Sequence, residues 1–299
     1  MPNPELKIAV IGLPGKWSSE TLADALAERT GWRCIIDPAR LQVDLVNNRV
    51  HADGLNLCEL DGVMIKKIGP QYSPLMLDRL ELLRFVEQCG VRLFSRPGRI
   101  MRLVDRLAGT LVLRQGDIPM PPTIITEQIE EAIEYIHQFG QAILKPLYST
   151  KAKGMVVLNA RKLNHKQLKS RLAAFKAQHG LLYIQQKLEL PGQDMGLVFL
   201  NGAYMGAYAR IKGNKWHTAT SGGGKYAPAQ PTAETIAIAQ RAQALFGLDY
   251  TTVDMAETEM GPVCFEVSAF GGFRGALEGL NLNMAHKFAD FAVQCLQSP

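Results

Sequence analysis

Two acidic residues near the end of the chain have the types and spacing of a metal site. Asp254 and Glu266 each stand between apolar neighbours, in segments with the composition of strands. A turn at 259–261 would pair these strands symmetrically about Met260 and place Asp254 opposite Glu266, with Cβ atoms about 5 Å apart. Like charges this close need a cation between them, and hard carboxylate oxygens suit Mg²⁺. The alternative, in which one acid faces solvent, is disfavoured by the apolar flanks.

The second of these segments also carries a hydroxyl. Successive side chains of a strand point to opposite faces, so Glu266 and Ser268 are expected on one face, with Phe265 and Val267 on the other. Ser268 therefore shares the face of the acidic pair.

A group of lysines has the character of a phosphate site. Lys145 ends an apolar strand, and the polar loop 148–154 that follows adds Lys151, Lys153 and three hydroxyl side chains. Ammonium and hydroxyl groups in such a loop can cover phosphates. A lone lysine at a strand end is usually only solvated, so this signal gains weight from the acidic pair later in the chain.

The glycines near the N-terminus do not form a phosphate loop. In Gly12-Leu-Pro-Gly15-Lys16-Trp17-Ser18 the first glycine is one residue too close to the second, and Trp17 separates the lysine from the serine. We expect a tight strand-to-helix turn instead, with substrate contact left open because helix N-termini attract anions. The substrate is expected between 15–18, 66–72 and the loop 221–225 with Arg274.

Composition excludes several classes of protein. The 299 residues are 47% hydrophobic and 20% charged, and no apolar run reaches the roughly 18 residues of a membrane span. Five widely spaced cysteines without metal spacing indicate reduced thiols and a cytoplasmic location. A net charge of +5 does not indicate a nucleic-acid partner. The acid-free stretch 135–188 predicts either a cationic docking surface or a solvated helix at 162–176, and the second is favoured.

The elements that must position these residues change character along the chain. Residues 1–96 alternate strands (Lys7–Ile11, Cys34–Ile36, Gly62–Ile65, Val91–Phe94) with helices (Ser18–Arg29, Pro74–Gln88), which predicts a small parallel-sheet α/β domain. One helix is expected over Gly98–Gln115. Two α+β domains are expected over 97–185 and 186–299, with helices at 127–138, 165–178, 233–246 and 283–296, and strands at 142–147, 155–158, 181–188, 195–200, 204–210, 251–256 and 262–267.

The order of these features resembles the ATP-grasp superfamily. It runs from Lys145-Pro on a strand, through a loop of small residues, to the Gln-rich strand at 184–188 and a strand bearing Arg210. A glycine loop, Val-Asp254-Met and Phe-Glu266-Val-Ser268 complete it. The amino-acid ligase branch is most similar, typified by the glutamate ligases that modify ribosomal protein. The residues at 95–97 and 145–150 also resemble those of the GAK-system subgroup.

The resemblance implies a role for each matching residue. Lys145, assisted by Arg106, would hold the α- and β-phosphates, and Arg210 would steady the transferred phosphoryl group. The adenine would meet the hinge at Gln186 and Leu188, and the ribose would meet Asp194; Asp254, Glu266 and Ser268 would be the metal ligands. Gln186 and Ser268 depart from the acid and the Asn that are usual in the family at these positions.

The activity implied is that of an ATP-dependent, ADP-forming carboxylate–amine ligase that works through an acyl phosphate. Its cofactors would be ATP and one or two Mg²⁺ ions, with Mn²⁺ left open. Its substrate would be a small-molecule or peptide carboxylate, with no membrane partner and with homo-oligomerisation left open. The alternatives are a small-molecule kinase that phosphorylates a hydroxyl, for which no general base is evident, and a nucleotide-binding regulatory protein, which the intact pair of acids disfavours.

Overall fold

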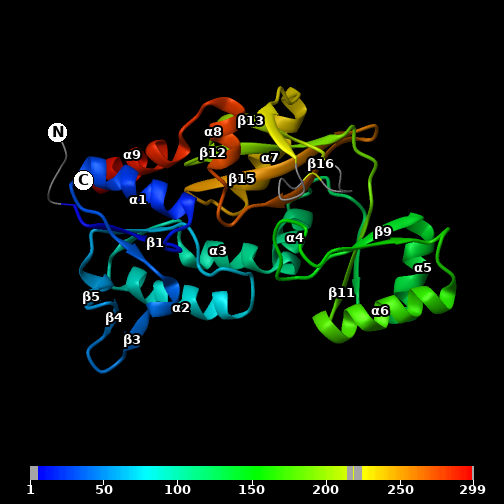
Figure 1. Cartoon of the computed structure of the whole chain (residues 1–299), viewed down its shortest axis with the longest axis horizontal. Helices are drawn as coiled ribbons and strands as arrows, with labels where there is room; N and C mark the ends of the chain where they lie inside the picture. Colours follow the sequence, from blue (N-terminus) through cyan, green and yellow to red (C-terminus); the bar gives the residue numbers. More distant parts are fainter. Residues whose placement is uncertain (1–5, 214–217, 219–223, 298–299) are drawn as a thin grey trace.

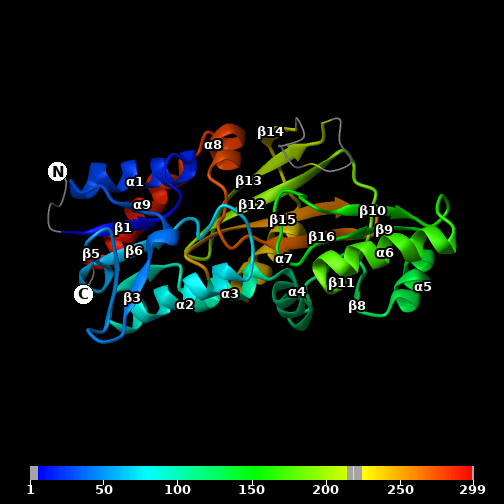
Figure 2. The same ribbon diagram turned by 60° about the horizontal axis from the view of Figure 1, so that its bottom comes forward.

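The computed structural model describes residues 6–213, 218 and 224–297. Its elements form three bodies along the long axis of the molecule, each built on a sheet (Figure 1). A parallel sheet lies at one end, a five-stranded antiparallel sheet lies in the middle, and a four-stranded antiparallel sheet lies at the other end (Figure 1 and Figure 2). The predicted class, a parallel α/β unit followed by antiparallel α+β units, is confirmed. The limits 1–96, 97–185 and 186–299 stay a proposal.

The first body is a doubly covered parallel sheet, as its apolar strands predict. Its order is β2-β1-β6-β7, and the side chains of β1 are at most 1% exposed. A parallel sheet buried on both faces requires such continuous apolar runs. The C-terminal helix α9 returns to pack against α1 (Figure 1). The elements are β1 (Ile8–Ile11), α1 (Trp17–Thr30), β2 (Ile35–Ile36), β6 (Gly62–Ile65), α2 (Leu75–Gln88), β7 (Arg92–Phe94) and α9 (Met284–Gln297).

A small antiparallel sheet within this body was not expected. Its strands are β3 (Gln42–Asp44), β4 (Arg49–Ala52) and β5 (Leu55–Asn56). They are short and mostly polar, so they lack the apolar period that marks a strand in sequence.

The single helix predicted over Gly98–Gln115 is wrong, because the chain breaks at Asp105. Asp105 is extended (φ −92°, ψ 118°), and its carboxylate accepts a hydrogen bond from the Leu107 N–H at 2.9 Å. This is an N-cap, so one helix ends and another begins there. The two helices are α3 (Pro97–Val104) and α4 (Arg106–Gln115). The break makes Arg106 the first residue of α4.

The antiparallel four-stranded sheet at the far end of the molecule carries its helices on one face. The core between the sheet and its helices is closed by buried aliphatic side chains such as Ile136, Leu144, Leu172 and Ile184. The strand order is β10-β9-β11-β8. The elements are β8 (Thr123–Thr126), α5 (Ile129–Phe139), β9 (Gln141–Leu144), β10 (Val156–Asn159), α6 (His165–His179) and β11 (Leu182–Gln186).

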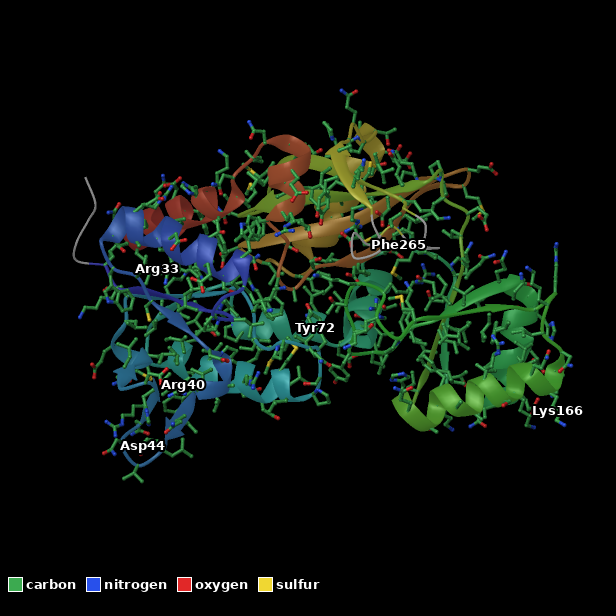
Figure 3. The ribbon with its side chains drawn as sticks, in the orientation of Figure 1. Arg33, Arg40, Asp44, Tyr72, Lys166 and Phe265 are labelled. Carbon is green, nitrogen blue, oxygen red and sulfur yellow. The ribbon has the colours of Figure 1, made fainter. Side chains whose placement is uncertain are left out.

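The basic side chains of α6 have acidic neighbours on α5 and in the segment just before it. Lys169 and His165 contact Glu130, and Lys176 lies 3.7 Å from a carboxylate oxygen of Glu127. Figure 3 shows Lys166 on α6 at the outer end of the molecule, far from Phe265. These contacts favour the solvated helix over the docking surface for the stretch without acids.

The five-stranded sheet has a different helix on each face. Ile238 and Ala239 of α7 pack with Leu197 and Val253, whereas Ala276 of α8 packs on the opposite face. Alternation along the strands separates these two sets of side chains. The strand order is β14-β13-β12-β15-β16. The elements are β12 (Gln193–Leu200), β13 (Ala203–Ile211), β14 (Lys225–Pro228), α7 (Ala233–Ala244), β15 (Tyr250–Thr258), β16 (Gly261–Val267) and α8 (Arg274–Leu280).

The hairpin of β15 and β16 pairs Asp254 with Glu266, as predicted, but its turn and its register differ from the predicted ones. Near the turn the partners are Thr258 and Gly261, so the connection has two residues and is not centred on Met260. The register then shifts by one residue at a bulge that contains Phe265. An extra residue in one strand moves the pairing along by one, and this restores the opposition of the acids.

The α8 face contains glycines that no other residue can replace without displacement. A Cβ on Gly275 would lie 2.4 Å from the Tyr208 ring, whereas a Cβ on the helical Gly98 would meet nothing within 4 Å. We therefore expect Gly275→Ala to destabilise the protein by about 1–3 kcal/mol through overpacking. Gly98→Ala, its matched control in α3, should be neutral or stabilising by up to about 1 kcal/mol. Urea unfolding of the two variants measures the difference, and equal midpoints would contradict the close approach.

Candidate active site

A cavity of about 380 Å³ lies between the four-stranded and five-stranded sheets. It brings together residues that are up to 205 positions apart in the chain, from Lys67 to Gly272. Every candidate residue from the sequence except Lys153 lines it: Arg106, Lys145, Lys151, Gln186, Leu188, Asp194, Arg210, Asp254, Glu266 and Ser268.

The floor of the cavity is a set of polar residues on one face of the five-stranded sheet. Asp254 is paired with Glu266 on one side and with Gly196 on the other, while Arg210 is paired with Asp194. Residues directly opposite in an antiparallel ladder share a face. The register therefore collects three carboxylates and one guanidinium on the face that α8 covers.

Arg210 lies between two of these carboxylates. Its Nε and second terminal nitrogen donate to Asp194 at 2.8 and 3.0 Å, and its remaining nitrogen donates to Asp254 Oδ1 at 3.0 Å. Burial raises the pKa of Asp254 to about 7, against the opposing effect of Arg210 and with a further rise from Glu266. Arg210 thus offsets part of the desolvation of Asp254.

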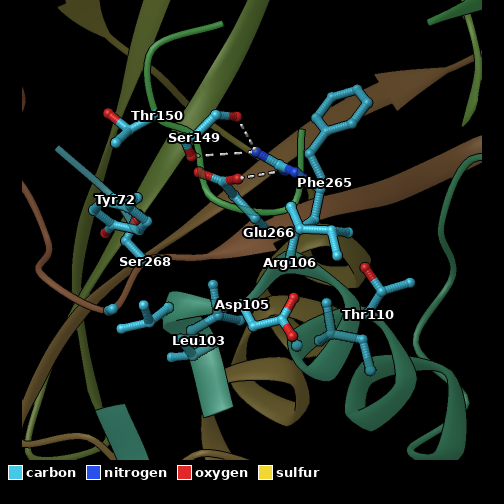
Figure 4. A pocket seen from close by; sticks show the side chains of 16 residues that line it. Tyr72, Leu103, Asp105, Arg106, Thr110, Ser149, Thr150, Phe265, Glu266 and Ser268 are labelled. Carbon is cyan, nitrogen blue, oxygen red and sulfur yellow. Dashed lines mark hydrogen bonds and ion pairs between the residues drawn. The ribbon is translucent and has the colours of Figure 1, made fainter. Parts of the chain in front are cut away.

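Arg106 is the guanidinium partner of Glu266 and reaches it from the opposite wall of the cavity. Its guanidinium donates to Glu266 Oε2 at 3.1 Å, to the Pro146 carbonyl at 3.2 Å and to Ser149 Oγ at 3.3 Å (Figure 4). Its side chain is 8% exposed, so these bonds replace its lost hydration. Arg106 therefore fastens β16 to α4 and to the loop after Lys145.

These two arginines correct the expectation of unpaired facing acids. Each carboxylate of the opposed pair has its own guanidinium partner, so repulsion between them is already reduced in the protein alone. Within the described part of the chain no three acidic, histidine or cysteine side chains converge as a metal cluster. The donor set that remains, two opposed carboxylates with Ser268 nearby, fits a hard cation that completes its shell with oxygens of a ligand.

Lys145 lies buried at the side of the cavity, 7% exposed. Its ammonium group donates to Gln185 Oε1, and the amide of Gln185 donates in turn to Thr123 Oγ1 at 2.9 Å. Burial, followed by the charge of Arg106, lowers the pKa of Lys145 to about 7. A buried cation with only neutral hydrogen-bond partners is suited to an incoming anion. Sequence reasoning named Gln186 and missed Gln185, although alternation places only one of the two beside Lys145.

The hinge and the polar loop complete the walls. β11 ends at Gln186, whose N–H donates to the Pro122 carbonyl at 2.8 Å, and Leu188 follows outside the sheet. In the loop, Lys151 (φ 56°) and Ala152 (φ 58°) both have left-handed backbone, and Lys151 faces the cavity. Such strain in residues other than glycine is concentrated at functional sites.

Sequence reasoning missed several lining residues. Phe265 was expected on the opposite face from Glu266, but the bulge brings it into the cavity, where its ring lies 5.8 Å from Lys145 Nζ. Lys67 and Tyr72, within the 66–72 region predicted near the substrate, also line the cavity, as does Tyr208.

Other parts of the predicted substrate region lie elsewhere. Arg274 stacks on Trp17, with 5.1 Å from its guanidinium carbon to the ring centroid, and neither residue lines the cavity. Residues 221–223 of the predicted glycine loop 221–225 lie outside the described residues.

Comparison with known families gives a match over residues 104–292 to the RimK-like ATP-grasp domain. Among characterised sequences, the tetrahydromethanopterin:α-L-glutamate ligase of Methanocaldococcus jannaschii is 26% identical over 245 residues, which cover 81% of this chain and 82% of the relative. A probable α-L-glutamate ligase of Legionella pneumophila is 26% identical over 294 residues, which cover 96% of this chain and 95% of the relative.

Solved structures share the fold over nearly the whole chain. The ATP-grasp ligase PsnB, solved with a phosphomimetic variant of its minimal precursor, Mg and ADP, aligns with a TM-score of 0.76. The alignment covers 99% of this chain and 100% of PsnB at 18% identity. No helix among the described residues has the length and apolar character needed to cross a membrane.

The buried state of Lys145 predicts proton uptake on nucleotide binding. With a pKa of about 7, Lys145 is mostly neutral at pH 8, and phosphate anions favour its charged form. ATP binding at pH 8 should therefore take up about one proton, and affinity should fall as the pH rises above 7. Calorimetry in buffers of different ionisation enthalpy measures this uptake.

The control for this prediction is a second lysine of the same region. Lys145→Met should abolish the uptake and weaken ATP binding by about 1.5–3 kcal/mol, whereas Lys153→Met should preserve both. Equal proton uptake in the wild type and in Lys145→Met would assign the titrating group elsewhere.

Proposed function

This chain belongs to the RimK-like ATP-grasp family and is an ATP-grasp ligase, and on that premise we propose that it joins a carboxylate to an amine through an acyl phosphate, with release of ADP. One observation carries the proposal. A single cavity presents buried cations, Lys145 and Arg106, opposite a pair of facing carboxylates, Asp254 and Glu266. Such a site can hold a triphosphate on one side and its cation on the other.

The first step forms the acyl phosphate, and different residues stabilise different parts of it. A carboxylate oxygen of the substrate attacks the γ-phosphorus while the bond to the β–γ bridging oxygen breaks, and ADP leaves. Lys145 and Arg106 neutralise the charge on the phosphates, and Arg210 stabilises the oxygens of the group in transfer. Bound between Asp254 and Glu266, with Ser268 as a third donor, Mg²⁺ would supply neutralisation of the β- and γ-phosphate charge.

The second step needs no covalent bond to the protein. The nitrogen of a neutral amine attacks the carbonyl carbon of the acyl phosphate, and the C–O bond to phosphate breaks. Phosphate leaves with the electron pair of that bond and takes up the proton that the nitrogen loses. Arg210 faces the oxyanion that develops at that carbon. Since Asp194 holds Arg210 through two hydrogen bonds, we assign Asp194 to orienting Arg210 as well as to the predicted ribose contact.

The identity of the substrates is the finer part of the proposal. Two relatives carry α-L-glutamate in their names, which supports L-glutamate as one substrate, and the other would be a small molecule or a peptide. We propose one or two Mg²⁺ ions, replaceable by Mn²⁺, and a cytoplasmic location supported by five free thiols. The kinase alternative is not favoured, because the similar proteins are named as ligases.

Trapping of the acyl phosphate tests the reaction class. With ATP, Mg²⁺, L-glutamate and candidate carboxylates, hydroxylamine should give a hydroxamate together with ADP. Release of AMP, or a stable phosphoester in place of the hydroxamate, would contradict the ligase mechanism.

The facing acids predict a sharp effect of one substitution. Glu266→Gln keeps the shape of the side chain but removes the charge that would hold the cation, so ADP formation should fall by at least about 100-fold. The fold should persist, because the amide oxygen of glutamine can still accept the hydrogen bond that Arg106 donates to Glu266. Steady-state assays over a range of Mg²⁺ concentrations measure the effect.

The matched control lies in the same hairpin. Glu259→Gln changes an exposed acid at the turn and should leave activity unchanged. Retention of ATP turnover by Glu266→Gln at ordinary Mg²⁺ concentrations would exclude the hairpin as the metal site.

A further inference from the structure

Tyr208, in the middle of β13, lines the cavity but takes no part in the contacts described above. The residue is 4% exposed, so nearly all of its surface is buried. No hydrogen bond to that hydroxyl is formed by the residues that the structure describes. A buried tyrosine hydroxyl usually finds a partner, and one that lacks it at a cavity wall is suited to a ligand.

Three glycines fix the position of this side chain. A Cβ at Gly196 would lie 2.4 Å from Cζ and 2.5 Å from the hydroxyl oxygen of Tyr208, and one at Gly275 would lie 2.4 Å from the ring. A Cβ at Gly279 would lie 2.7 Å from the Cβ of Tyr208. Glycine therefore surrounds the side chain from its base to its hydroxyl, on β12 and on α8. The ring has one place to lie, and that place is set by backbone.

The sheet register shows where the hydroxyl is directed. Tyr208 is paired with Gly196 on β12, and Gly196 is paired with Asp254 on β15. All three share a face, and the hydroxyl oxygen lies over Gly196. The ring thus extends across β12 toward Asp254, on the same face as Arg210 two residues along its own strand.

The charges around the hydroxyl define what it would bind. Arg210, Asp254, Asp194 and the ring of Tyr226 are its charged and titratable neighbours, and burial raises its pKa. The phenol stays protonated and can donate a hydrogen bond. A donor beside the Arg210 guanidinium and opposite the acidic pair would meet the oxygens of an anion held between them.

Building on the proposed function, we propose that the Tyr208 hydroxyl donates a hydrogen bond to an oxygen of the phosphoryl group after it leaves ADP. Tyr208 and Arg210 would then contact the same phosphoryl group, and the three glycines would fix the direction of the Tyr208 hydroxyl. Asp254 would hold the cation on the other side of that group.

Tyr208→Phe tests this, because it removes the hydroxyl and keeps the ring between the glycines. The probe is inorganic phosphate titrated into the protein with saturating ADP and Mg²⁺. Calorimetry should show phosphate affinity about tenfold lower in the variant, as expected for loss of a hydrogen bond to a charged group. ADP affinity should stay within about twofold, because the hydroxyl faces the transferred group. Tyr204→Phe, on the same strand but outside the cavity lining, should match the wild type.

Stability separates this role from a structural one. A hydroxyl with no partner in the free protein should be lost without cost, so the melting temperature of Tyr208→Phe should equal that of the wild type. Unchanged phosphate affinity, equal losses of ADP and phosphate affinity, wild-type protein that binds no phosphate, or a variant that fails to fold would each overturn the proposal. Hydroxamate formation tests the ligase mechanism separately, so failure of either idea can be told from failure of the other.

Discussion

The pairing of each carboxylate of the site with a guanidinium is the interaction on which this site depends. Asp194, Asp254 and Glu266 lie on one sheet face, and Asp254 is opposite Glu266. Carboxylates at that spacing repel one another unless cations lie beside them. Arg210 supplies the positive charge from within the sheet, and Arg106 supplies it from outside. The site is therefore held in shape before any nucleotide or metal ion arrives.

Arg106 reaches Glu266 from α4, so the position of this helix also sets the geometry of the site. The N-cap at Asp105 ends α3 and starts α4 with Arg106, which then contacts the loop after Lys145 as well as β16. A continuous helix would rotate this side chain and separate the two walls of the cavity. A local capping preference, worth about 1 kcal/mol, thus decides which residues meet across the cavity.

Sequence patterns predicted the helices and strands that have a clear apolar pattern and missed those that lack one. The limits of β6 were predicted to the residue, whereas the short β14 and the glycine-rich α8 were not foreseen. The hairpin is instructive, because the predicted turn was wrong and a bulge at Phe265 restored the predicted pairing. No period in the sequence signals a bulge, nor that Arg106 meets a residue 160 positions away. The positions of Lys145, Asp254 and Glu266 in or directly after apolar strands were predictable, because that signal is local to each segment.

The two arginines also explain how the charged side chains of the site could change partners when a nucleotide and a metal ion bind. In the free protein Arg106 and Arg210 stand near the carboxylates where a metal ion would bind, and among the described residues Lys145 donates a hydrogen bond to Gln185. A nucleotide with its cation would bring both signs of charge together. Under the proposed roles, the phosphates would give Lys145 and the arginines anionic partners, and the cation would give the carboxylates a second positive neighbour. Because each charge would gain a partner and none would be left buried alone, this charge balance favours binding of the pair over binding of either component. We therefore expect ATP and Mg²⁺ to bind cooperatively.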